Sequence, residues 1–412
     1  MQETSSKYAV GIDVGTTTVR CVVAYLDSTT GIPSIIGVGL APNSGMRKGT
    51  VVNLTGPAQA IDEALGEAER MSGYQVDSAT ISVNGTHIIS THADGMIAVG
   101  SHDHEITKED IARIEEVATI GKVPANREIL EVVPHAYKLD GQDNIKDPLG
   151  MTGTRLEIDA HVVSVLTPHL VNLQKAAESA KVSPNSIIVA GVAASRAVLS
   201  EKQIENGVAL IDMGGSTTNI EIYEEGDLQF TAVVPFGGIN LTNDLAIGLK
   251  TDPEIAEKLK IEHASAVSKS DSAGISLEYN GEIYSFNKND IDEIIEARLE
   301  EIFESINNEL KRADRAGKLP CGVVLTGGTA MLKGIADYAR ESLGVAACVG
   351  VPSGYGGVAD GIDSPQFATV IGLMLLDSEN SDNTKHSSKS KNGGLLTVGM
   401  GTISKLIGRL RT

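Results

Sequence analysis

Two short segments of this chain share one plan, and the distance between them constrains the fold more than any other feature. In each, an apolar strand ends in an aspartate, and a glycine turn with threonines leads into a second apolar strand: GIDVGTTTVR (11–20) and LIDMGGSTTNIEIY (210–223). The two aspartates, Asp13 and Asp212, lie 199 residues apart. A repeat at this spacing predicts two duplicated domains, which 412 residues can hold at roughly 150 residues per domain.

Apolar runs that alternate with amphipathic stretches predict an α/β fold. The runs are rich in valine and isoleucine and are bounded by glycine: YAVGIDVG, TVRCVVAYL, GVALIDMGG, IEIYEEG and GVVLTGG. Several are apolar on both faces, as is typical of central strands covered by helices. Residues 57–73 and 289–315 carry apolar side chains at helical spacing, so we expect two core-facing helices there.

The two repeated turns have the composition of phosphate-binding hairpins. Glycine lets a ligand approach the backbone closely, so the turn can present its N–H groups to an anion. Two such hairpins that face each other would enclose phosphates from both sides. Asp13 and Asp212 would then hold a hydrated Mg²⁺, since this ion prefers a few carboxylates together with water and phosphate oxygens. Either motif alone is most often only a tight turn, so the prediction depends on their match and on a third element.

The third element is VVLTGGTAMLKGI (323–335), in which a strand leads into a glycine pair and then into a helix. Gly327 and Gly328 have no side chain, so an adenosine can lie against the backbone at this point. A lone glycine pair proves little. The ordered set of two phosphate hairpins and an adenosine loop predicts a nucleotide-binding site.

Residues 84–160 interrupt this pattern. They contain strand-like pieces, the segment TKED (107–110), which is typical of a capping box, and the extended run EILEVVPHAYKLD (128–140). We expect an inserted α+β subdomain. Residues 377–394 contain no apolar side chain, which predicts a flexible linker and a folded body that ends near Leu376.

In its order of elements the chain resembles the actin-like ATPase superfamily, and over nearly its whole length it is similar to the bacterial FtsA family of cell division proteins. Three stretches carry the closer resemblance: LDGQDNIKDPLGMTGTRLEIDAHVV (139–163), AGVAASRAVLSEKQIENGVALIDMGGSTT (190–218) and PFGGINLTNDLAIGL (235–249). The resemblance implies an α/β, actin-like fold of duplicated ribonuclease-H-type domains, with an inserted α+β subdomain, a flexible linker and a C-terminal amphipathic helix. It also implies ATP and Mg²⁺ as ligands.

The resemblance further implies which residues of this sequence contact the ligand. The implied cofactor contacts are Gly15, Thr16, Thr17, Gly214, Gly215, Ser216, Thr217, Thr218, Gly237, Gly238, Glu257, Lys260, Gly327, Gly328, Thr329 and Met331, with Asp13 and Asp212 at the metal. Among them, Glu257 and Lys260 would lie near the ribose and base. No residue is identified as catalytic.

The same resemblance divides the chain into domains. The first actin-like domain comprises residues 1–83, 161–205 and 352–376, and the inserted subdomain comprises residues 84–160. The second actin-like domain comprises a large subdomain, 206–230 with 311–351, and a small subdomain, 231–310. A linker (377–394) and an amphipathic membrane-targeting helix (395–412) follow.

Departures from the family pattern bear on hydrolysis. Ser216 and Asn219 stand where the commoner forms have glycine and aspartate, and Thr18 replaces a frequent lysine in the first hairpin. A missing lysine removes one cation that could neutralise phosphate. Because the backbone and magnesium contribute most of the grip, we expect ATP binding with slow hydrolysis or none.

The chain has one basic island, at its C-terminal end. Residues 383–412 contain six Lys or Arg and no acid, so the remaining 382 residues carry a charge of -26. The apolar face of the expected helix comprises Leu396, Met400, Ile403, Leu406, Ile407 and Leu410, opposite Lys405, Arg409 and Arg411. A core helix docked on the body is the alternative, but the apolar-free linker favours a helix that lies flat on an anionic membrane. FtsA-like proteins are similar in carrying such a helix.

The family resemblance implies a role for the whole protein. It would form filaments on the cytoplasmic face of the plasma membrane at the division site, and would hold the tubulin-like protein FtsZ there. The FtsZ C-terminal tail would dock near residues 231–310, and the inserted subdomain would serve polymer contacts and later division proteins. One alternative is the related pilus-assembly protein PilM, which lacks the linker and terminal helix. Another is a small-molecule kinase, for which no general base identifies itself.

Composition excludes other classes. A net charge of -20 argues against a protein whose main partner is nucleic acid. Cys21, Cys321 and Cys348 are far apart, which argues against a disulfide framework and favours a reducing cytoplasm. The histidines near HDH (102–104) match no familiar ligand spacing, so we expect surface or core histidines rather than a metal site.

Overall fold

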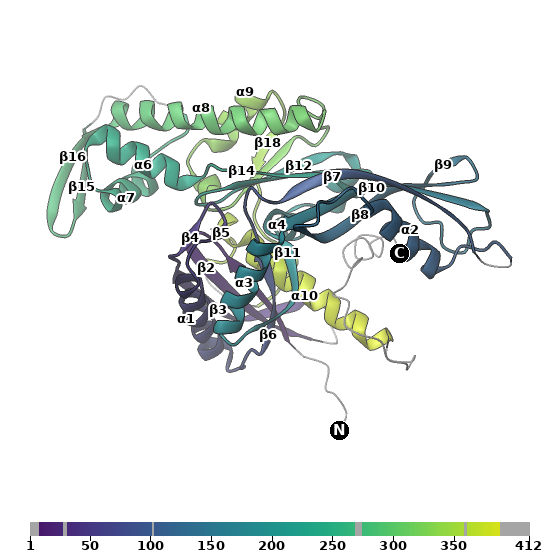
Figure 1. Cartoon of the computed structure of the whole chain (residues 1–412). Coiled ribbons are helices and arrows are strands. Elements are labelled where there is room, and N and C mark those ends of the chain that lie inside the picture. Colours follow the sequence, from purple (N-terminus) through teal and green to yellow (C-terminus); the bar gives the residue numbers. More distant parts are fainter. Residues whose placement is uncertain (1–7, 28–30, 101–102, 268–273, 358–360, 388–412) are drawn as a thin grey trace.

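Two α/β halves, each with a five-stranded sheet, form the body of the molecule (Figure 1). The computed structural model describes residues 8–27, 31–100, 103–267, 274–357 and 361–387. The sheet of the first half consists, in spatial order, of β11 (Ser183–Val189), β6 (Ser78–Val83), β1 (Tyr8–Val14), β2 (Thr18–Leu26) and β3 (Pro33–Pro42). That of the second consists of β14 (Asp227–Val234), β13 (Thr218–Glu224), β12 (Val208–Met213), β17 (Val323–Thr326) and β18 (Ala347–Val349).

The two sheets have the same topology. In each, the central strand pairs antiparallel with the strand that follows it and parallel with a strand on its other side: β1 with β2 and β6, and β12 with β13 and β17. The outer strands also correspond. On one side β3 pairs antiparallel with β2, as β14 does with β13. On the other side β11 pairs parallel with β6, as β18 does with β17. The duplication that the repeat predicts is confirmed.

Helices cover the sheets where the sequence places apolar stripes. The first half contains α1 (Thr55–Ser72), α3 (Thr167–Ser179), α4 (Ala190–Val198) and α10 (Ala368–Ser387), with a small hairpin of β4 (Met46–Arg47) and β5 (Thr50–Val51). The predicted helix at 57–73 is α1, which buries Ile61, Ala64, Leu65 and Ala68 and ends at Gly73. Gly73 has a φ of 69° and donates its N–H to the carbonyl of Glu69, so a residue without a Cβ ends the helix.

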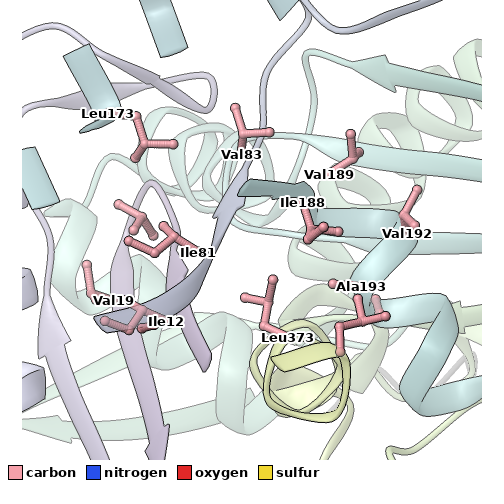
Figure 2. Close-up of a cluster of buried hydrophobic side chains, with 14 of the residues drawn as sticks. Ile12, Val19, Ile81, Val83, Leu173, Ile188, Val189, Val192, Ala193 and Leu373 are labelled. Carbon is pink, nitrogen blue, oxygen red and sulfur yellow. The ribbon is translucent and has the colours of Figure 1, made fainter. Parts of the chain in front are cut away.

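The core of the first half packs α1, α3, α4 and α10 against its sheet, and Figure 2 shows part of it. Figure 2 shows Ile12 and Ile81 from neighbouring strands on the side of Leu373 of α10. Glycine allows the close approach, because a Cβ on Gly372 of α10 would lie 1.7 Å from the carbonyl oxygen of Ala193 in α4. The two helices therefore cross at backbone contact distance.

The second half carries its own helices and a projecting small unit. Its helices are α5 (Glu201–Asn206), the 3₁₀ turns η1 (Gly328–Met331) and η2 (Pro365–Phe367), and α9 (Ile335–Leu343). The small unit consists of α6 (Gly238–Leu249), α7 (Pro253–His263), the β15 (Gly274–Tyr279) and β16 (Glu282–Asn287) hairpin, and α8 (Lys288–Arg312). The helix predicted at 289–315 is α8, whose buried face includes Ile295, Leu299 and Ile306.

The inserted subdomain is a separate sheet with one helix. Its strands lie in the order β7 (Ile89–Ala98), β10 (Arg155–Leu166), β8 (Arg127–Leu139) and β9 (Gln142–Ile145), and α2 (Lys108–Thr119) packs against β7 and β10. The predicted capping box begins α2: Thr107 accepts from the N–H of Asp110, and the Asp110 carboxylate accepts from the N–H of Thr107. This element of the sequence analysis is confirmed.

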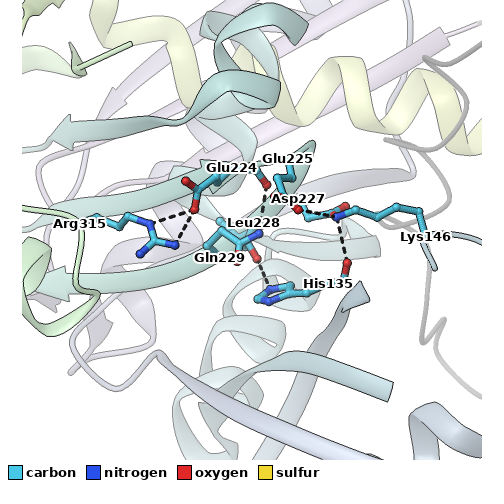
Figure 3. A network of polar contacts seen from close by, with 8 residues as sticks. All are labelled: His135, Lys146, Glu224, Glu225, Asp227, Leu228, Gln229 and Arg315. Carbon is cyan, nitrogen blue, oxygen red and sulfur yellow. Dashed lines mark hydrogen bonds and ion pairs between the residues drawn. The ribbon is translucent and has the colours of Figure 1, made fainter. Parts of the chain in front are cut away.

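Polar contacts fasten the inserted subdomain to the β13–β14 turn of the second half (Figure 3). Lys146 Nζ lies 2.8 Å from Asp227 Oδ2 and also donates, over 3.0 Å, to the carbonyl oxygen of His135. The Nε2 atom of His135 lies 3.0 Å from the carbonyl oxygen of Leu228. Because β13 begins at the second glycine hairpin and ends at this turn, one strand connects that hairpin to the inserted subdomain.

Several predicted domain bounds fall inside elements. The bound at 160 divides β10, the bound at 230 divides β14, and the bound at 310 divides α8. In β10, Val162 belongs to the core of the inserted subdomain, whereas Val163 belongs to the core of the first half. A strand that passes from one core into the next changes neither composition nor period, so the sequence alone carries no mark of the boundary.

The predicted start of the linker at Asp377 is wrong. Helix α10 continues to Ser387, and the Asp377 side chain is buried. Its carboxylate accepts from the N–H of Val10 at 2.9 Å, from the Thr80 hydroxyl at 2.8 Å and from the Asn185 amide at 3.1 Å. These partners come from distant parts of the chain, so polarity alone misled the prediction. Residues 388–394 of the linker and the helix predicted at 395–412 lie outside the described residues.

Within the described part of the chain, no helix combines the length and the apolar character that a membrane crossing requires.

Candidate nucleotide-binding site

The neighbouring strand β6 supports the first glycine hairpin. Asp13 is the last residue but one of β1, and its Oδ1 accepts a hydrogen bond of 2.8 Å from the Ser82 hydroxyl on β6. The same hydroxyl accepts from the N–H of Val14 at 2.9 Å. At the turn, the N–H of Gly49 donates to Thr16 Oγ1 over 3.1 Å. The hairpin is thus fixed on both sides before any ligand arrives.

In the second hairpin the support comes from the hairpin's own second strand. Asp212 is the last residue but one of β12 and is only 6% exposed, and Asn219 across the hairpin donates to its Oδ2 over 3.0 Å. The turn closes through a 2.9 Å hydrogen bond from the N–H of Gly214 to the carbonyl of Thr217. Asn219 therefore supports the carboxylate at a position where the commoner family members have an aspartate.

The two hairpins meet. Ser216 donates from its hydroxyl to Thr16 Oγ1 over 2.8 Å, which joins the two turns directly. A Cβ on Gly215 would lie 2.9 Å from the Thr17 side chain, so only glycine fits there without displacing it. Asn84, which follows β6, donates to Thr217 Oγ1 over 3.2 Å. The two predicted phosphate loops therefore lie in direct contact with each other.

The charge of Asp13 acts on the pKa of Asp212 in the second hairpin. The pKa of Asp212 is raised to about 6, chiefly by burial and in part by the charge of Asp13, against the hydrogen bond from Asn219 and the charge of Arg20. Burial likewise raises the pKa of Asp13, although Arg20 and Ser82 oppose this. A divalent cation would offset the repulsion between two buried carboxylates. The donor set fits Mg²⁺, which takes few protein ligands, and the described residues contain no cluster of three or more His, Cys, Asp or Glu that would form an all-protein cage.

Arg20 is the residue that the sequence analysis missed. It lies opposite Asp13 in the β1–β2 hairpin. Burial lowers the pKa of Arg20, and the charges of both aspartates oppose this. Its Nε is buried without a hydrogen-bond partner among the described residues. A guanidinium N–H without a partner is suited to an anionic ligand. Arg20 is thus a cation within the first hairpin, where Thr18 stands in place of a frequent lysine. The available signal was an arginine inside the otherwise apolar run TVRCVVAYL.

The adenosine loop lies against the second hairpin. Gly327 has a φ of 86°, and a Cβ there would lie 2.4 Å from Asp212 Oδ1 and 2.6 Å from the Met213 carbonyl oxygen. Thr329 donates from its hydroxyl to the carbonyl of Gly214 over 2.9 Å. The expected helix does not start at the glycines: the single 3₁₀ turn η1 contains Gly328 and ends at Met331, and α9 begins only at Ile335.

The residues expected near the ribose and base gather at the same place. Lys260 Nζ donates to Glu257 Oε2 at 2.7 Å and to the carbonyl of Gly238 at 3.1 Å. The N–H of Gly238 in turn donates to the Gly214 carbonyl over 3.0 Å, which ties this pair to the second hairpin. Gly237 also abuts that hairpin, because a Cβ on it would lie 2.5 Å from the same carbonyl oxygen.

Other predicted positions either join this site or lie outside the description. Gly15 and Thr218 belong to the two hairpins; the Gly15 carbonyl accepts from Asn43, and the Thr218 hydroxyl donates to the Phe236 carbonyl. The membrane-facing residues Leu396, Met400, Ile403, Lys405, Leu406, Ile407, Arg409 and Leu410 all lie outside the described residues.

The histidines pack against one another and onto their neighbours. The rings of His87 and His169 stack 4.4 Å apart, and those of His135 and His161 stack 4.8 Å apart. Burial, with the charges of its neighbours, lowers the pKa of His161 to about 4, so this side chain is neutral at physiological pH.

Comparison with known proteins bears on this geometry. A family model described as cell division protein FtsA matches residues 209–372, and one described as the SHS2 domain inserted in FtsA matches residues 85–164. The chain is 34% identical over 375 residues to a cell division protein FtsA of Pseudomonas aeruginosa, covering 90% of this chain and 89% of the relative. It is 36% identical over 369 residues to a cell division protein FtsA of Bacillus subtilis, covering 89% and 82%.

Solved structures share the fold at low identity. A PilM–PilN type IV pilus biogenesis complex matches with a TM-score of 0.67 at 16% identity, covering 91% of this chain and 99% of the other. MreB5 of Spiroplasma citri bound to AMPPNP matches with a TM-score of 0.52 at 13% identity, covering 92% and 99%. The predicted actin-like fold is confirmed by these likenesses.

Proposed function

The chain belongs to the FtsA family of bacterial cell division proteins, and from that premise we propose that it binds ATP with Mg²⁺, forms filaments and holds FtsZ to the membrane. The observation that carries the first step is the contact between the two glycine hairpins, with Asp13, Asp212 and Arg20 beside it. Backbone N–H groups and Arg20 would bind the phosphates, and the two aspartates would hold the cation. Bound Mg²⁺ neutralises phosphate charge.

Hydrolysis is slow in this proposal. Asp13 and Asp212 are engaged by Ser82 and Asn219, and their place at the proposed cation leaves neither as a general base for water. Nucleotide binding is measured by titration of a fluorescent ATP analogue with and without Mg²⁺. Asp13→Ala should abolish the gain in affinity that Mg²⁺ gives. Equal affinity of both proteins at all Mg²⁺ concentrations would remove the metal from the proposal.

Filaments and membrane attachment form the second step. One amphipathic helix without Trp or Phe binds a membrane only modestly, whereas a filament brings many helices to one surface and gains about 10² to 10⁴ in avidity. The test is electron microscopy of the full chain on an anionic lipid monolayer with ATP and Mg²⁺. We expect membrane-bound filaments. The same chain without residues 395–412 should leave the monolayer bare, and filaments on the lipid despite the truncation would contradict the proposed anchor.

The small unit is the proposed dock for the FtsZ C-terminal tail. Three of its large apolar side chains are strongly exposed: Ile247 on α6, Ile261 on α7 and Ile283 on β16 are 76%, 70% and 74% accessible. Such side chains can bind the apolar residues of a peptide. Aspartate at each position is tested by fluorescence anisotropy with a labelled FtsZ tail peptide. At least one should weaken binding tenfold or more, whereas Ile120→Asp on the inserted subdomain, where the side chain is equally exposed, should not.

The inserted subdomain would serve contacts between filament subunits and with later division proteins, at the division site on the cytoplasmic membrane face. The pilus-assembly alternative loses its support, because the likeness to the PilM complex is one of fold at 16% identity, whereas the FtsA relatives reach 34% and 36%.

A further inference from the structure

Two consecutive residues just before α10 touch Arg20. Gln366 accepts, through Oε1, a hydrogen bond of 3.3 Å from Arg20 Nη2. The Arg20 Cζ lies 5.7 Å from the centre of the Phe367 ring, within the range of a cation–π contact. Both residues belong to η2, whereas Arg20 belongs to β2 of the first hairpin. The Arg20 guanidinium therefore connects the first hairpin to this short turn.

The turn that receives Arg20 is itself fixed by the second half of the molecule. The carbonyl of Pro365 accepts from the N–H of Gly327 at 3.1 Å and from the Thr326 hydroxyl at 3.2 Å. Phe367 is only 5% exposed, and Thr369 hydrogen-bonds Asp212. These contacts leave a residue in η2 little freedom to move.

An arginine side chain has several rotatable bonds. It contributes more to ligand affinity when its orientation is already fixed before binding, because less conformational entropy is then lost. Gln366 presents a neutral acceptor to one Nη, and Phe367 presents a ring face. Neither carries a charge that would compete with phosphate for the guanidinium. No described residue competes as a hydrogen-bond acceptor for the buried Nε of Arg20.

We propose that Gln366 is a positioning residue for nucleotide binding: it holds the Arg20 guanidinium in the orientation in which it meets the phosphates. The inference rests on the proposed binding of ATP and deepens it. It also places the first hairpin and the helix that leads out of the folded body in contact, because η2 runs directly into α10.

The test is a double-mutant cycle on the full chain with fluorescent ATP and ADP analogues in the presence of Mg²⁺. Its members are the wild type, Arg20→Met, Gln366→Met and the double variant. Gln366→Met should weaken ATP binding about five- to tenfold in the wild-type background and less than twofold in the Arg20→Met background. Gln75→Met, at an exposed loop position, is the matched control and should change nothing.

A structural role would give a different pattern. Equal weakening by Gln366→Met in both backgrounds, or no weakening in either, overturns the proposal. Thermal unfolding without nucleotide separates a loss of fold from a loss of orientation, and Gln366→Ala repeats the cycle if the methionine variant does not fold. A wild type that binds no nucleotide fails the proposed function and this inference together, whereas binding with the wrong cycle fails the inference alone.

Discussion

Three charged side chains, Asp13, Asp212 and Arg20, are buried close to one another at the two glycine hairpins, and their charges interact. Two carboxylates and one guanidinium together carry a net charge of -1. Burial makes that net charge unfavourable, because each charge has lost solvent and the carboxylates repel each other. This charge balance supports the proposal of a ligand that carries both a cation and acceptor oxygens, as magnesium nucleotide does.

The raised pKa of Asp212 gives this residue a pH signature. Its pKa in the folded chain is about 6, against 3.8 without burial. The folded state then binds a proton more tightly than the unfolded state, so the contribution of Asp212 to stability is complete at low pH and declines as the pH rises through about 6. Asp212→Asn should therefore stabilise the ligand-free protein more at pH 8 than at pH 5. The two changes in the free energy of unfolding should differ by on the order of 2 kcal/mol, and thermal unfolding at both pH values measures them.

In the proposed site, the titration of Asp212 should also control the affinity for Mg²⁺. Mg²⁺ competes with the proton, so the Mg²⁺-dependent part of ATP affinity should fall between pH 7.5 and pH 5.5 in the wild type. Asp212→Asn should remove this pH dependence. The pH dependence that comes from protonation of the nucleotide phosphates should remain. Calorimetric titration at the two pH values measures both. An unchanged pH dependence in the variant would mean that another group titrates.

At the scale of elements, close glycine contacts decide which helices can pack on which strands. Gly11 of β1 faces α10, where a Cβ would lie 2.5 Å from the carbonyl oxygen of Val370. Gly39 of β3 faces α1, where a Cβ would lie 1.8 Å from the Ala64 carbonyl oxygen. These positions explain why a chain with 44 glycines forms a tightly layered α/β body.

Alanine at two helical glycines should have opposite effects on stability. At Gly372 a methyl group meets the Ala193 backbone at 1.7 Å, so α10 and α4 must separate at a cost of about 1–3 kcal/mol or more. At Gly66 of α1 a Cβ meets no described atom within 4 Å, and alanine should stabilise by roughly 0.5–1 kcal/mol. Urea unfolding measures both. Equal effects at the two positions would contradict the packing that we describe.

The contact between Lys146 and Asp227 should control how firmly the inserted subdomain is held. Partly exposed ion pairs contribute about 0.2–1 kcal/mol, so Lys146→Met should hardly change the unfolding temperature. Hydrogen exchange at residues 127–145 should nevertheless become faster, because local opening requires less energy than global unfolding. Lys138→Met is the matched control, since its partner Asp143 lies within the inserted subdomain itself. Equal protection in both variants would show that apolar contacts alone hold the subdomain.

Prediction from sequence succeeded where the signal is local. Thr107 with Asp110, the apolar stripe of α1, and the two Asp–Gly turns each depend on residues a few positions apart. It failed for Asp377 and for the Arg20–Gln366 pair, because their partners lie up to 367 residues away in the chain. A polar residue that is satisfied by distant partners looks the same in sequence as one that faces water.

At the scale of the whole molecule, charge is divided unevenly between body and tail. The body carries -26, whereas residues 383–412 contribute six positive charges. An anionic membrane therefore repels the body and attracts the tail. Three basic residues near the surface contribute about 3 kcal/mol, which a single subunit must set against this repulsion and against the loss of its freedom. Monomers should accordingly bind weakly, and assembly should decide where the protein lies.

Membrane binding should therefore depend jointly on nucleotide and on salt. Sedimentation with vesicles that contain phosphatidylglycerol should show strong binding with ATP and Mg²⁺ at about 0.1 M salt and weak binding without nucleotide. At 0.5 M salt the attraction is screened, because the Debye length falls well below about 8 Å, and binding should decline. Leu406→Glu should abolish it, whereas Ile120→Glu, at an equally apolar exposed position on the body, should not. Binding that is strong without nucleotide would mean that a single tail suffices, and the coupling between assembly and attachment would then have to be given up.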